Sequence, residues 1–71
     1  MRKKQDKMPV YTDGRRKYTV MPWMVVDRQL WRVVFQAVGM WWSLMPKTAW
    51  HQTRDEALEE LETLRKDKGW K

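Results

Sequence analysis

The sequence predicts a small α+β fold, in which a three-stranded antiparallel sheet packs against one C-terminal α-helix. Two observations lead to this prediction: residues 30–38 alternate as a strand does, and residues 53–56 carry a helix-capping motif. The 71 residues suffice for one small domain and include six tryptophans and no cysteine. A core built largely from aromatic rings is therefore expected, without disulfides.

The N-terminal residues 1–9 are expected to form a disordered basic arm, ahead of a single domain that spans residues 10–71. Residues 1–8 are mostly charged or polar and show no periodic apolar pattern. Residues 12–15, Thr-Asp-Gly-Arg, form a turn signal, because Gly14 tolerates a positive φ. Apolar and β-branched residues flank this signal, so a short hairpin is possible there.

Residues 18–26 are rich in Thr, Val, Trp and Tyr, which favours a strand. Pro22 lacks an N–H group, so this strand is predicted to lie at a sheet edge or to carry a bulge. A polar break is expected at residues 27–29. The next strand is predicted over residues 30–38, and a third over Met40–Met45, after a turn at Gly39 and before Pro46.

The alternation in residues 30–38 assigns side chains to two faces of the sheet. One set is predicted to face the core, namely Trp31, Val33, Phe35 and Ala37. The other set is expected to be half exposed, namely Arg32, Val34 and Gln36.

A helix over residues 30–45 is the competing interpretation. Arg32, Gln36, Gly39 and Ser43 recur at helical spacing and would form a narrow polar stripe. Paired valines, adjacent tryptophans and a central glycine are poor helix formers, so strands are favoured.

The C-terminal helix is predicted to begin after Thr53, whose hydroxyl and the Glu56 side chain fit a capping box. Acidic residues crowd the first turns and basic residues the last, which matches the helix dipole. Gly69 fits a left-handed C-terminal position that would let Trp70 fold back. The predicted core contains Trp31, Phe35, Leu58, Leu61 and Leu64.

No motif for catalysis, a cofactor or a metal stands out. The chain lacks a dinucleotide fingerprint, a P-loop and an H-E-x-x-H motif, and it has a single histidine, His51. A single His without any Cys does not make a metal site. The glutamates recur at helical spacing and are interpreted as the solvent-exposed face of an amphipathic helix. The protein is expected not to be an enzyme and to use neither cofactor nor metal.

Positive charge and tryptophan together predict a nucleic-acid-binding module, with duplex DNA as the favoured partner. The net charge is +6, and residues 1–18 carry seven Lys or Arg against two Asp. Cationic side chains neutralise phosphates, and aromatic rings stack on bases. Besides the basic arm, the candidate contact residues are Arg15, Arg16, Lys17, Trp23, Arg32, Trp41, Trp42 and Lys47. Their expected location is the sheet face opposite the helix.

The order of aromatic strands and a Thr-capped helix resembles the arm-binding domains of tyrosine-type integrases, and more loosely the plant AP2 domain. The likeness covers about residues 17–70 and rests on Trp31-Arg32-Val33, Trp41-Trp42 and Thr53-Arg54-Asp55-Glu56-Ala57. It implies a three-stranded sheet that enters the major groove of DNA. Pro22 and the long segment before the helix depart from that pattern.

A protein-binding role is the alternative interpretation. Small, Trp-rich, Cys-free chains resemble the inhibitors that phages make against host enzymes, and this one could present a Trp/Met patch to a host protein. Met21, Met24, Met40 and Met45 would suit such a patch or a homodimer interface. The longest apolar stretch, Leu30–Met45, contains Arg32 and is short for a membrane span. A cytoplasmic protein without membrane association is expected.

Overall fold

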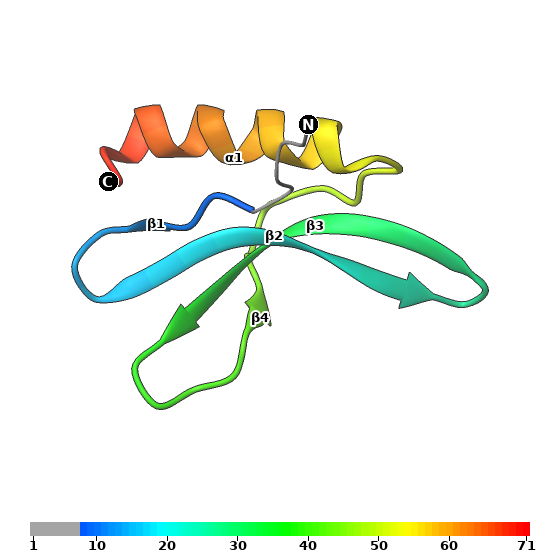
Figure 1. The fold of residues 1–71 in the computed structure, drawn as a ribbon, viewed down its shortest axis with the longest axis horizontal. Coiled ribbons are helices and arrows are strands. Elements are labelled where there is room, and N and C mark those ends of the chain that lie inside the picture. The colour runs from blue at the N-terminus through cyan, green and yellow to red at the C-terminus, as the bar shows by residue number, and fades with distance from the viewer. Residues whose placement is uncertain (1–7) are drawn as a thin grey trace, which may run out of the picture.

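The computed structural model describes residues 8–71 as one sheet and one helix (Figure 1). The elements are β1 (Tyr11–Thr12), β2 (Arg16–Val25), β3 (Arg28–Ala37), β4 (Ser43–Leu44) and α1 (Arg54–Lys68). The strands are antiparallel, in the order β1-β2-β3-β4, and α1 lies across one side of them. The predicted α+β class with its C-terminal helix is confirmed. The predicted number of three strands is wrong, because the sheet has four: the short strands β1 and β4 flank the central pair β2 and β3.

The predicted basic arm lies mostly outside the described residues, which begin at Met8. Met8 packs against the core, and the Pro9 carbonyl accepts a hydrogen bond from the Thr19 hydroxyl at 2.7 Å. Met8 and Pro9 therefore belong to the folded domain, although the sequence assigns them to the arm.

β2 and β3 form a hairpin of two ten-residue strands, with a register from Arg16 opposite Ala37 to Val25 opposite Arg28. Only Val26 and Asp27 connect the strands, so the expected polar break at residues 27–29 is wrong: Arg28 and Gln29 are in β3. Val26 has φ 62°, the positive value that a two-residue hairpin loop needs and that Gly or Asn usually supplies. The turn is hidden in the sequence because a valine occupies that position.

The helix covers the sheet face that carries Tyr18 and Val20 of β2 and Val33 of β3. These three residues form a buried cluster with Ala57 and Leu61 of α1 and with Trp70, which follows the helix. Leu61 is fully buried, as predicted. The other predicted core residues pack at the border of the cluster and are half-buried: Trp31, Phe35, Leu58 and Leu64.

The opposite face of the sheet also has a buried centre. Val34 is fully buried and Thr19 is 4% exposed, and they pair across β2 and β3. Val34 also pairs with Leu44 of β4, so it has strand neighbours on both sides. The expectation that Val34 is half exposed is therefore wrong, since alternation alone does not show how closely neighbouring strands surround a residue.

The region 30–45 is not a helix, and its second predicted strand is much shorter than expected. Only Ser43 and Leu44 pair with β3, while residues 38–42 form a loop that extends away from the helix (Figure 1). The chain then follows β3 again: Trp31 and His51 exchange backbone hydrogen bonds at 2.7 and 2.9 Å. Pro22 faces no second strand neighbour, because β1 pairs only with Lys17 and Tyr18, which agrees with the predicted edge position.

Both ends of α1 follow the sequence prediction. Thr53 accepts a hydrogen bond from the Glu56 N–H, and the Glu56 side chain accepts one from the Thr53 N–H. Gly69 adopts φ 76° and donates to the Arg65 carbonyl at 2.8 Å. The left-handed turn at Gly69 redirects the chain so that Trp70 reaches the sheet.

Candidate nucleic-acid interface

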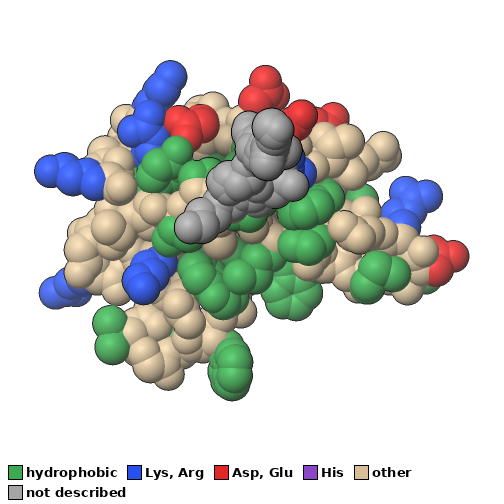
Figure 2. Space-filling model, viewed as in Figure 1, with side chains coloured by type: hydrophobic (Ala, Val, Ile, Leu, Met, Phe, Trp, Pro, Cys, Tyr) green, Lys and Arg blue, Asp and Glu red, His purple; other side chains and the backbone are tan. Residues whose placement is uncertain are grey.

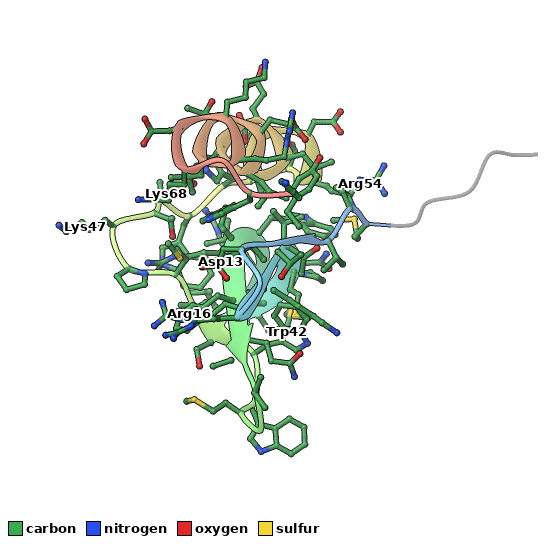
Figure 3. All side chains as sticks on the ribbon, turned by 90° about the vertical axis from the view of Figure 1, so that its left-hand side faces the viewer. Asp13, Arg16, Trp42, Lys47, Arg54 and Lys68 are labelled. Atoms are coloured by element: carbon green, nitrogen blue, oxygen red, sulfur yellow. The ribbon has the colours of Figure 1, made fainter. Side chains whose placement is uncertain are left out.

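Positive charge gathers at one end of the molecule, which we call the basic end. It is the left-hand end in Figure 2, where Figure 1 places the β1–β2 turn and the C-terminus of α1, and Figure 3 looks directly onto it. Its cations come from three separate parts of the chain and are Arg15, Arg16, Lys17, Lys47, Lys68 and Lys71. Acidic side chains are concentrated along α1. The basic end is therefore the natural surface for an anionic partner.

The β1–β2 turn holds the arginines of the basic end in place. The Asp13 carboxylate accepts the N–H groups of Arg15 and Arg16 at 2.9 and 2.8 Å, and the Tyr18 hydroxyl at 2.8 Å. These bonds favour the charged carboxylate, with that from Arg16 contributing most, and lower the pKa of Asp13 to about 2. Asp13 is thus ionised at neutral pH and fixes the backbone on which the two arginines sit.

Strand alternation divides the basic run Arg15-Arg16-Lys17 between two faces of the sheet. Arg16 shares the helix face with Phe35, and its guanidinium carbon lies 5.4 Å from the centre of that ring. Lys17 lies on the other face, opposite Gln36, and together with Arg15 lines a shallow hollow beside Val38 and Gly39. The run therefore presents cations on both sides of the sheet end.

The loop between β3 and β4 carries Trp41 and begins at Val38 and Gly39, which share a hollow with Arg15 and Lys17. The Met40 N–H donates to the Ala37 carbonyl at 3.1 Å, and the Gln36 amide donates to the Met40 carbonyl at 3.0 Å. The Ser43 hydroxyl donates to the Trp41 carbonyl at 3.4 Å. Although its backbone is held by these bonds, the Trp41 side chain is 88% exposed. The neighbouring Val38 and Met40 are exposed as well, so the loop is an apolar projection beside cations.

Lys47 belongs to the basic end through a turn in the segment that follows β4. Pro46 and Lys47 form this turn, with Lys47 at φ 65°, and the Thr48 hydroxyl donates to the Met45 carbonyl at 2.6 Å. Figure 3 shows Lys47 on the same side as Lys68, and both line a pocket together with Arg16. Lys68 and Lys71 are not among the sequence candidates, because only the fold brings the end of the helix to the β1–β2 turn.

The Arg32 side chain is held by contacts within the domain and does not project freely into solvent. Its Nε donates to the Thr48 hydroxyl at 3.0 Å and its Nη2 to the Met45 carbonyl at 3.3 Å. Its guanidinium carbon lies 4.9 Å from the centre of the Trp50 ring, a cation–π geometry. Arg32 therefore attaches the irregular segment 45–50 to β3, and it is not brought together with Arg15 or Lys17.

The remaining candidate tryptophans differ from Trp41: Trp23 lies elsewhere in the sheet, and Trp42 is less exposed. Trp23 pairs with Leu30 near the Val26–Asp27 loop, at the far end of β2 from Arg15. Trp42 is half-buried, and Figure 3 shows it beside the strands, away from the helix. Of the eight candidates, the structure thus brings together Arg15, Arg16, Lys17 and Lys47 at the basic end, and Trp41 lies on the loop that begins beside Arg15 and Lys17.

Residues 8–71 contain no cluster of three His, Asp, Glu or Cys side chains suited to a metal ion. Over the same residues, no helix has the length and apolar character needed to cross a membrane. Comparison of the chain with models of known protein families, with curated proteins and with solved structures found no match.

Proposed function

We propose that the protein is a nucleic-acid-binding module that uses its basic end, with duplex DNA as its first target. Arg15, Arg16, Lys17 and Lys47 neutralise phosphates, and Trp41 stacks on or inserts between bases. The observation that carries the proposal is the highly exposed Trp41 on a hydrogen-bonded loop beside Arg15 and Lys17.

Two types of contact support the proposal, namely stacking by Trp41 and neutralisation of phosphates by the cations. A tryptophan that is 88% exposed leaves a large apolar face in water, and a base covers such a face well. Stacking of one base on an aromatic ring contributes about 1–3 kcal/mol. The adjacent cations add affinity through counterion release, so binding weakens as salt increases.

The test is a binding series with a fluorescent duplex and a single strand of the same sequence, across several salt concentrations. Trp41→Ala should weaken binding about 10-fold or more and leave the stability unchanged. Arg15→Gln with Lys17→Gln should weaken binding and reduce the slope of log K against log salt by about one unit for each lost contact.

Two matched variants act as controls for this series. Trp23→Ala removes a partly exposed tryptophan at the far end of β2, and Lys66→Gln removes a cation on the outer side of α1. Both should bind as the wild type does. Wild-type affinity in the Trp41 and Arg15/Lys17 variants, or no binding of either nucleic acid near physiological salt, would overturn the proposal.

A second candidate function, binding of a host protein as an inhibitor or adaptor, is favoured by a separate observation. The tip of the β2–β3 hairpin exposes Trp23, Met24 and Val26 together, the last at 95% exposure. Exposed apolar clusters of this kind are typical of protein interfaces. In that case Trp23→Ala, and not Trp41→Ala, would abolish recovery of one stoichiometric partner in a pull-down.

A further inference from the structure

A pocket of about 540 Å³ lies at the basic end between the sheet, the segment after β4 and the last turns of α1. Its apolar wall consists of Phe35, Met45, Pro46 and Leu64. Arg16, Lys47 and Lys68 supply three cations around this wall, and Asp67 supplies one carboxylate. The volume is within the range that small-molecule sites occupy.

None of the three cations of the pocket forms an ion pair within residues 8–71. Among residues 8–71 the ion pairs are His51 with Glu60 and Arg65 with Glu62, and neither involves the pocket. Arg16 lies over the face of Phe35, which orients its guanidinium at the apolar wall. Lys47 has the positive φ that a lysine rarely adopts, and this backbone places it on the pocket rim. An anion with an apolar body fits this arrangement.

We propose that the pocket binds one nucleoside monophosphate unit. The base lies against Met45 and Leu64, the phosphate is held by Arg16, Lys47 and Lys68, and Asp67 accepts an N–H of the base. This inference rests on the proposed function, because it assigns the pocket to a nucleotide at an unpaired strand end. The same chemistry would also admit a free mononucleotide, and the experiment distinguishes a free nucleotide from a strand end.

Simpler anions would match fewer of the groups that line the pocket. Inorganic phosphate would leave the apolar wall without a partner. An aliphatic carboxylate would fill the wall but would offer no N–H group to the Asp67 carboxylate. A nucleotide supplies a flat apolar face, an anion and hydrogen-bond donors in one molecule. Guanine is the sharpest probe, since its N1–H and N2–H groups lie side by side and match a carboxylate.

The experiment is an NMR titration of the ¹⁵N-labelled chain with dGMP, deoxyguanosine and inorganic phosphate, followed at the amides of Phe35, Met45 and Leu64. dGMP should bind at least 10-fold more tightly than either fragment. Arg16→Gln and Lys47→Gly should each weaken dGMP binding several-fold, and the glycine also suits the backbone at that position. Lys66→Gln, on the outer side of α1, is the matched control and should change nothing. Asp67→Asn should reduce the preference for dGMP over dTMP.

A second arm compares single strands that carry or lack a 5′-terminal guanosine phosphate. If the wild type prefers the phosphorylated strand and Lys47→Gly abolishes this preference, the natural ligand is a strand end. dGMP binding without that preference would overturn the strand-end assignment and leave a free nucleotide. No shift with dGMP, or equal affinity in Lys47→Gly, would overturn the pocket proposal, while strand binding through Trp41 would persist. Loss of all strand binding would instead overturn the proposed function.

Discussion

The Trp70 ring stacks face to face on Tyr18, with ring centroids 3.6 Å apart and planes inclined by 5°. Tyr18 is in β2 and Trp70 follows the helix, so this contact fastens the C-terminal segment to the sheet. Next to it the Lys71 N–H donates to the Thr12 carbonyl at 2.8 Å. The Tyr18 hydroxyl also bonds Asp13, which holds the arginines of the basic end. The stack therefore supports both the core and the candidate interface.

Removing the Trp70 ring should destabilise the fold strongly. Trp70 is 4% exposed, and truncation of a buried aromatic residue costs about 3–5 kcal/mol. Trp70→Phe retains a ring over Tyr18 and should cost clearly less. Urea unfolding followed by circular dichroism measures both variants. A loss below about 1 kcal/mol for Trp70→Ala would show that the stack contributes little.

Leu61 should be the most sensitive position on the helix. It is fully buried at the centre of the core, so Leu61→Ala should lower the free energy of unfolding by about 2–5 kcal/mol. Leu58 is half-buried at the border, and Leu58→Ala should cost less. Equal effects of the two substitutions in denaturant titrations would contradict this description of the core.

Replacing Val26 with glycine should stabilise the protein. Valine at φ 62° is unfavourable, because its Cβ atom crowds the backbone in the left-handed region. Val26→Gly relieves this strain and should add about 0.5–1 kcal/mol after the entropy cost of glycine is included. Val26→Ala keeps the Cβ atom and is the control. Thermal melts that rank alanine equal to glycine would argue against strain at this loop.

The β1–β2 turn should lose stability in acid through Asp13. Backbone N–H groups of Arg16 and Arg15, then the Tyr18 hydroxyl, lower its pKa from 3.8 to about 2. A depressed pKa stabilises the folded state fully above the unfolded value, and this contribution is lost as pH falls from about 4 through about 2. The stability difference between wild type and Asp13→Asn should therefore shrink over that range. Melts from pH 5 to pH 2 give this difference, and a constant difference would contradict the assignment.

The helix and the strand pattern of β3 were predictable because their signals are local. The capping box from Thr53 to Glu56 and the left-handed Gly69 are readable within a few residues, and both are present. Residues 30–38 alternate as a strand pattern requires, and β3 covers most of them. The short β1 also lies at the hairpin suggested around Gly14.

The features that the sequence did not predict depend on contacts between distant parts of the chain. Val34 is buried because β2 and β4 flank it, and Trp70 is in the core because Tyr18 meets it. In the candidate site, the sequence indicated the basic run at Arg15 and the surface position of a tryptophan at Trp41 or Trp42. It did not show that Arg32 would bind Thr48 and Trp50, or that Lys68 would join Arg16.

The Tyr18–Trp70 stack also bears on the order in which the protein folds. The β2–β3 hairpin closes over two residues and α1 carries its own caps, so both can form early at little loop-closure cost. The stack joins residues from opposite ends of the described chain and can form only once the helix has docked. We therefore expect Trp70→Phe to accelerate unfolding and to leave the refolding rate nearly unchanged.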